Sequence, residues 1–148
     1  KIATENMWNW DKEKDESLPA ACSLAEDFCR HIDIVNDDFF VACLDIGHAE
    51  MKGSNTTAVE MIKALGNRLK ALHIHDNDKR HDNHQIPFSM DIDFTSVVKA
   101  LKEINYKGYF TLESNDYLRN FTKDNVHIAV EDFANAAKKL VNIFDSIN

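Results

Sequence analysis

Two patterns of hydrophobic and polar positions alternate along the chain. Short apolar runs occupy residues 1–6, 39–45, 69–75 and 109–113. After each run come turn-forming residues, and then a segment whose apolar positions recur every three or four residues, as on one face of a helix. Apolar strands that alternate with amphipathic helices are typical of parallel strands covered by helices and joined by right-handed crossovers. The pattern therefore predicts an α/β fold.

The helical segments are bounded by start and stop signals. Ser17-Leu18-Pro19 predicts an N-cap with proline in the first turn of a helix that runs to Ile32. The charged segment before it, residues 11–16, is interpreted as a solvated loop. The caps expected for the later helices are Thr56 or Thr57, Asp93 and Asp124.

The number of strand–helix units limits the architecture. Four units fit in 148 residues, whereas a complete (β/α)₈ barrel uses eight in roughly 250 residues. We therefore expect about half of a TIM barrel, with four parallel strands and their covering helices. The chain starts without Met, inside a strand, and we expect it to be part of a longer polypeptide. Because the inner sheet face and both sheet edges would be open, we expect a homodimer or association with an N-terminal half-barrel.

Composition narrows the class of partner. The chain has 17 basic and 25 acidic residues, a net charge of −8, and no cluster of Lys and Arg to bind phosphates, which weighs against nucleic acid as a partner. The longest apolar run, residues 39–44, is far shorter than the roughly 20 residues that span a bilayer. Three unevenly spaced cysteines do not suggest a secreted disulfide framework. We expect a cytoplasmic protein that acts on a small metabolite.

Residues that bind metals follow the predicted strands. Glu5, Asp45, His75 and Glu113 each lie at the carboxyl end of a different strand, which is the end where parallel sheets and barrels place their sites. A single carboxylate after a strand is more often a helix cap or a solvated loop residue. Four residues of metal-binding type, one at the end of each of four strands, are harder to explain in that way. Three carboxylates and one imidazole suit a divalent ion such as Mn²⁺, Mg²⁺, Co²⁺ or Zn²⁺.

Further polar residues are expected near the carboxyl end of the sheet, which would form the mouth of the site. The turn at Gly47 would return His48 toward it, and Asp82 and His84 would face the same way in an extended loop. Trp8 follows Glu5 and would offer an apolar wall to a sugar ring. His73 is interpreted as a structural residue that points away from His75, toward the helix layer.

Four motifs, in order along the chain, resemble the sugar phosphate isomerase/epimerase family. They are IATENM at residues 2–7, LDIGHA at 44–49, LGNRLKALHIHDND at 65–78 and LES at 112–114. This family belongs to the xylose isomerase-like TIM barrels, which also include metal-dependent apurinic-site endonucleases. The resemblance covers nearly all of residues 1–148 and implies the C-terminal half of such a barrel. Relatives usually follow the D-x-H loop with Pro and a Gly-containing turn, whereas this chain reads Pro87-Phe88-Ser89-Met90, so the loop is expected to close differently.

The resemblance also implies a mechanism and the roles of residues. One divalent metal would be bound by Glu5, Asp45, His75 and Glu113, and the two glutamates would act as acid and base. A sugar or sugar phosphate would be isomerised or epimerised by proton transfer alpha to its carbonyl, through a metal-stabilised enediolate. The residues implied to contact substrate or to bind additional metal are His48, Asp82, His84, Asn77 and Trp8.

Two alternatives remain open from the sequence. In the endonuclease branch, elements matching Asp45/His48, residues 75–78 and Asp82/His84 bind zinc, which would indicate an apurinic-site phosphodiesterase. A half-barrel of this kind could instead be a non-catalytic interaction module. The number of bound metal ions separates the isomerase from the phosphodiesterase.

Overall fold

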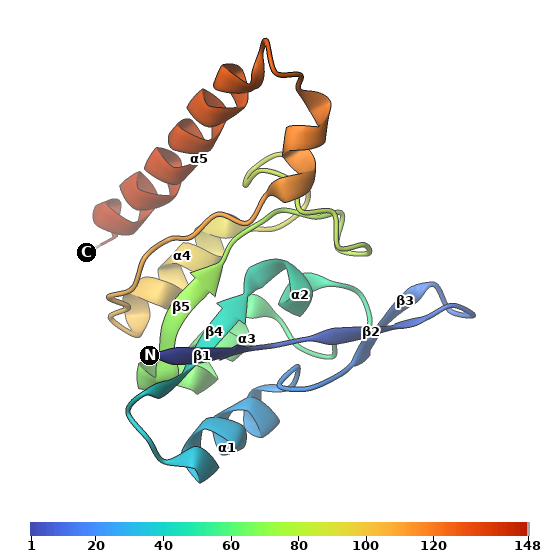
Figure 1. Ribbon diagram of the computed structural model, residues 1–148. Helices are drawn as coiled ribbons and strands as arrows, with labels where there is room; N and C mark the ends of the chain where they lie inside the picture. Colours follow the sequence, from blue (N-terminus) through green and yellow to red (C-terminus); the bar gives the residue numbers. More distant parts are fainter. Residues whose placement is uncertain (148) are drawn as a thin grey trace.

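A computed structural model describes residues 1–147 of the chain. Its main sheet has three parallel strands in the order β1-β4-β5 (Figure 1). Their bounds are Ile2–Glu5 for β1, Phe40–Asp45 for β4 and Leu69–His73 for β5. A single parallel bridge between Ile74 and Leu112 extends the sheet beyond β5. The α/β prediction is confirmed, and the arrangement is that of a partial α/β barrel.

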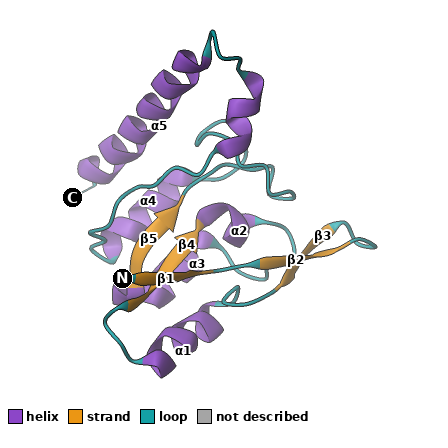
Figure 2. Cartoon of the chain, viewed as in Figure 1, coloured by secondary structure: helices purple, strands orange, loops and turns teal. Residues whose placement is uncertain are grey.

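Helices follow the strands and cover one side of the sheet (Figures 1 and 2). The core lies between them, where Ala42, Leu44 and Leu72 are fully buried against apolar helix residues such as Phe28 and Phe94. The helices are α1 (Ala25–Val35), α2 (Ile46–Glu50), α3 (Ala58–Leu65), α4 (Phe94–Glu103) and α5 (Val126–Ser146), with 3₁₀ turns at Gly66–Arg68 and Asn115–Asn120. In residues 1–147, none of the helices combines the length and the apolar character that crossing a membrane requires.

Two predicted helix starts are confirmed by their capping hydrogen bonds. Thr57 accepts the backbone N–H of Glu60 at the start of α3. Asp93 accepts those of Thr95 and Ser96 at the start of α4. In both helices the cap satisfies N–H groups that the first turn leaves unpaired.

The predicted helix from residue 18 to Ile32 is wrong in its first part. Glu16–Pro19 forms strand β3, which pairs antiparallel with β2 (Trp8–Asp11) in a separate hairpin. Ser17 is buried, and both its N–H and its hydroxyl donate to the Lys52 carbonyl, so it cannot act as a helix cap. The charged residues 12–15 form the exposed turn of this hairpin, which agrees with the solvated loop expected for this segment.

The predicted fourth strand, residues 109–113, is reduced to the one bridge at Leu112. Within residues 1–147, this segment pairs on one side only, and Tyr109 is 88% exposed. The opposite side of the sheet from the helices carries Ala3, which is exposed, and the partly exposed Glu5 and His73. The last helix, α5, packs on α4 through Leu140 and so joins the helix layer.

Candidate metal centre

Four acid and imidazole groups converge at the carboxyl end of the sheet. Glu5 ends β1, Asp45 ends β4, His73 ends β5, and Glu113 follows the bridge at Leu112. Each offers one ligand atom, and these atoms all lie within 4.8 Å of one another. His73 Nδ1 lies 2.9 Å from Glu113 Oε2 and 3.3 Å from Glu5 Oε1. Three of the four residues are those predicted from the sequence.

The predicted imidazole of this group was His75, and the structure places His73 there instead. Residues two apart on a strand point to the same face, so the expectation that His73 turns toward the helices is wrong. The register pairs Asp45 directly with His73, and β5 ends at that residue. His75 lies beyond the strand, with its Nε2 3.1 Å from Asp45 Oδ1.

A second group lies beside the first. His48, His75, Asp82 and His84 also bring one ligand atom each within 4.8 Å of the others. The His75 and His84 rings stack with centroids 4.0 Å apart, and Asp82 Oδ2 lies 3.2 Å from His84 Nε2. The expectation that Asp82 and His84 face the same way is therefore confirmed. Asp45 joins the two groups, because it contacts His75 and belongs to the first.

A glycine makes room for this second group. A Cβ on Gly47, in the first turn of α2, would overlap the His75 imidazole. The Asn77 side-chain amide donates to the Gly47 carbonyl over 2.9 Å and is fully buried. Asn77 therefore fixes the turn against the loop after β5. Trp8, on the hairpin, has its ring centroid 6.3 Å from that of His48.

Charges in the second group stabilise one another. Burial alone would raise the pKa of Asp45, but its close contact with His75 and the charge of His48 lower it below its usual range. Burial opposes protonation of His48, yet the contacts with Asp82 and Asp45 raise its pKa to about 9. Burial likewise opposes protonation of His75, but its contact with Asp45 raises the His75 pKa. Burial would raise the pKa of Asp82, but its contact with His48 lowers it.

His73 is also held in its protonated form. Cys43, next to it on the sheet face, and the Glu5 carboxylate raise the pKa of His73 to about 11. The Glu5 and Glu113 carboxylates beside the imidazole favour its protonated form when no cation is bound. Because metal ligands must be deprotonated, binding of a cation here would release that proton.

The candidate ligand atoms are better placed to bind a cation than to form hydrogen bonds with one another. Among residues 1–147, five buried side-chain atoms lack a hydrogen-bond partner, and four of them belong to the two groups: Asp45 Oδ2, His73 Nδ1, His75 Nε2 and Asp82 Oδ1. Several of these atoms lie close to an oppositely charged atom but are poorly aligned for a hydrogen bond. Unpaired buried polar atoms are costly, and a divalent ion would satisfy them. Carboxylate oxygens and imidazole nitrogens are ligands that such ions accept.

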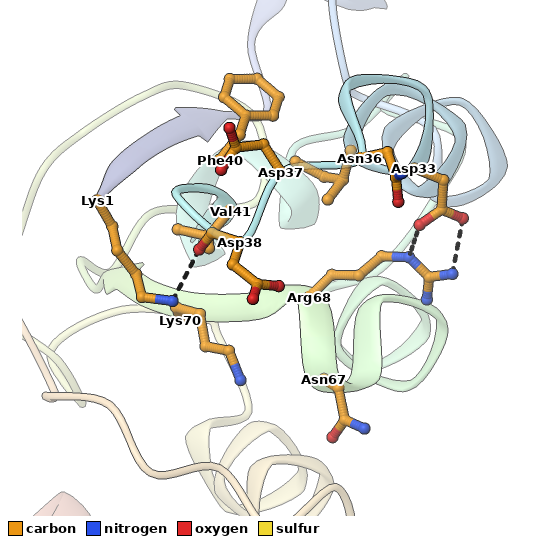
Figure 3. A pocket seen from close by; sticks show the side chains of 11 residues that line it. Lys1, Asp33, Asn36, Asp37, Asp38, Phe40, Val41, Asn67, Arg68 and Lys70 are labelled. Atoms are coloured by element: carbon orange, nitrogen blue, oxygen red, sulfur yellow. Dashed lines mark hydrogen bonds and ion pairs between the residues drawn. The ribbon is translucent and has the colours of Figure 1, made fainter.

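A pocket of about 430 Å³ lies at the other end of the strands (Figure 3). Lys1, Phe40 and Lys70, from the amino ends of the three strands, line it. Arg68 forms a two-point ion pair with Asp33 there, over 2.6 and 2.7 Å. None of the residues in the two groups borders this pocket, so it is separate from the site.

Comparison with known families gives the assignment. The family model described as xylose isomerase-like TIM barrel matches residues 1–140. The chain belongs to this family. Among other members of the xylose isomerase-like fold, the crystal structure of a D-tagatose 3-epimerase-like protein superimposes on 98% of the chain with a TM-score of 0.71 and 25% identity. That of D-psicose 3-epimerase, solved in the presence of D-fructose, covers 82% of the chain with a TM-score of 0.67 and 16% identity.

Curated relatives match a smaller part of the chain. Inosose dehydratase of Clostridium perfringens is 27% identical over an alignment of 106 positions, and the match covers 60% of the chain and 35% of that protein. This chain spans 25% to 35% of the length of the curated relatives it matches. It covers 48% and 44% of the two epimerase structures. The resemblance inferred from the four motifs is thus confirmed at the level of the xylose isomerase-like fold.

Proposed function

We propose that this chain carries the metal-binding and proton-transfer residues of a sugar isomerase or epimerase. The observation that supports this most is the convergence of Glu5, Asp45, His73 and Glu113 from three strands and one bridge onto a single volume. These four would hold one divalent ion, of which Mn²⁺, Mg²⁺, Co²⁺ and Zn²⁺ all suit the ligand set. When bound, the ion would act as a Lewis acid that polarises the substrate carbonyl.

Exposure separates the roles of the carboxylates. Asp45 is fully buried and contacts two histidines, so it would serve only as a ligand. The side chains of Glu5 and Glu113 are 26% and 33% exposed, which lets both reach a substrate. One of them, as a carboxylate, would take the proton from the carbon next to the carbonyl, and the other, in its protonated form, would deliver a different proton to the opposite face of the enediolate. Delivery to the same carbon gives an epimer. Delivery to the neighbouring carbon, with transfer of the hydroxyl proton between the two oxygens, gives an isomer.

The second group and the hairpin would form the wall of the sugar site. His48, Asp82 and His84 present hydrogen-bonding atoms beside the glutamates, and Trp8 adds an apolar ring face. Sites that bind sugars commonly combine aromatic faces with a few polar groups. The similarity to a D-tagatose 3-epimerase-like protein supports a keto-sugar as the substrate class.

Hydrogen exchange at the substrate tests this proposal. The protein would be incubated with Mn²⁺ and a ketohexose such as D-fructose in D₂O, and deuterium next to the carbonyl would be followed by NMR. We expect incorporation that depends on the metal and stops with a chelator. If no ketohexose or keto-pentose exchanges its alpha proton with any of the four metals, the proposal is wrong.

A second function is favoured by one observation, the presence of two adjacent ligand groups. The group of His48, His75, Asp82 and His84 would give a phosphodiesterase room for additional metal ions. The net charge of −8 opposes the approach of DNA. Metal analysis separates the two functions, because the isomerase needs one ion per chain and the phosphodiesterase needs more than one.

We also propose that a second half-barrel covers the open sheet face. Ala3 on this face is exposed, and the glutamates and His73 are partly exposed, while β1 forms an edge of the sheet. In a solution of the purified chain, the half-barrel available is a second copy. Light scattering coupled to size exclusion should therefore give twice the chain mass of 16.9 kDa. A monomer at every concentration tested would contradict this proposal.

A further inference from the structure

Asn6 is a buried amide at the junction of the two strands that carry Glu5 and Asp45. It directly follows Glu5 and is only 2% exposed. Its Nδ2 donates to the Asp45 carbonyl over 3.0 Å, and its Oδ1 accepts the Asp45 backbone N–H over 2.7 Å. The ladder between β1 and β4 ends one step earlier, with Glu5 paired to Cys43. The Asn6 side chain thus takes the place of backbone pairing and fixes both polar backbone groups of Asp45.

The backbone of Asn6 orients a second residue. Its carbonyl oxygen lies 2.9 Å from His48 Nδ1. A carbonyl only accepts, so Nδ1 must carry the proton in this contact. The other ring nitrogen, Nε2, is then the one directed at Asp82 Oδ2, 3.4 Å away. One residue therefore sets the position of Asp45 and the orientation of the His48 ring.

The direction of the Asp45 carboxylate depends on this clamp. Its Oδ1 already accepts the His48 N–H over 2.8 Å, and its Oδ2 is buried without a partner. The carboxylate can turn only within the space that its backbone position allows. Ligand groups must be held within a fraction of an ångström to bind a cation well, and the groups that hold them are worth about 10- to 100-fold in metal affinity.

We propose that Asn6 is a positioning residue of the metal centre, which holds Asp45 at the point where β1 and β4 separate. This inference rests on the proposed function, since it assumes that Asp45 binds the cation. Asn6 itself would not touch the ion or the substrate. Its effect should appear in the affinity and in the geometry of the site.

Titration of the purified chain with Co²⁺ and Mn²⁺ tests the proposal. Asn6→Ala should weaken binding of both ions about 10- to 100-fold by calorimetry and should change the visible absorption band of bound Co²⁺. Asn6→Ser keeps a hydroxyl that can satisfy one of the Asp45 backbone groups, so its affinity should lie between those of Asn6→Ala and the native chain. If Asn6→Ala does not fold, the Ser variant decides by the same two readouts.

Thr57→Ala is the matched control. This substitution removes the side-chain cap of α3 and so also costs stability, but Thr57 belongs to neither group of candidate ligands. Its Co²⁺ spectrum and both affinities should stay within twofold of the native values. Native affinity and spectrum in a folded Asn6 variant would overturn the role of Asn6. A native chain that binds neither ion would instead reject the metal centre itself.

Discussion

Replacing Glu5 or Glu113 with Gln is expected to reduce alpha-proton exchange about 10²- to 10⁴-fold at saturating Mn²⁺. The amide keeps the size of the side chain but loses the basic oxygen that takes the proton. Both side chains lie within 3.3 Å of His73 and remain partly exposed, so the change should not disturb the core. Deuterium incorporation into a ketohexose, followed by NMR, measures the effect.

The controls separate loss of the base from loss of the metal. Each variant would be assayed over a range of Mn²⁺ concentrations, so that weaker binding appears as a shift in the midpoint and loss of the base as a lower plateau. Glu60→Gln makes the same substitution on the exposed side of α3 and should leave the exchange unchanged. If exchange continues at the native plateau in both Glu5→Gln and Glu113→Gln, the glutamates are not the acid and base.

Bound metal should also stabilise the fold strongly. At about 1,000 times its dissociation constant, a ligand that binds only the folded state adds about 4 kcal/mol. For a domain of this size that corresponds to a rise in Tm of about 8–16 °C. This stabilisation is expected because buried atoms of Asp45 and His73 lack hydrogen-bond partners that a bound ion would replace. Differential scanning calorimetry with Mn²⁺, and again after a chelator, measures it.

Two histidine variants make this measurement specific. His73→Gln should lose most of the rise in Tm, because the structure places His73 beside both glutamates in the proposed centre. His75→Gln should keep most of it, because His75 lies in the neighbouring group and contacts only Asp45 of the four. The reverse result would restore His75 as the ligand and contradict the proposed centre.

The sequence predicts the fold class and three of the four residues of the proposed centre because both depend on simple periodicities. Apolar runs locate β4 and β5, and Glu5, Asp45 and Glu113 lie where the parallel strands or the bridge end. The fourth residue of the proposed centre depends on the length of β5. The strand ends at His73, two residues earlier than the apolar pattern suggests, and the chain then turns into the loop that carries His75.

Other features could not be predicted from local patterns, since they arise from contacts between distant segments. Ser17 looks like a helix cap in the sequence, but its hydrogen bonds to Lys52 make it part of a hairpin. Asn6 gave no signal, because its role depends on Asp45, 39 residues away. The close approach of Gly47 and His75 is likewise visible only once α2 is placed beside the loop after β5.

Anomalous scattering from crystals grown with Mn²⁺ tests the proposed centre most directly. We expect one strong peak per chain, with Glu5, Asp45, His73 and Glu113 around it. A peak found only among His48, His75, Asp82 and His84, or no peak at saturating Mn²⁺, would contradict it.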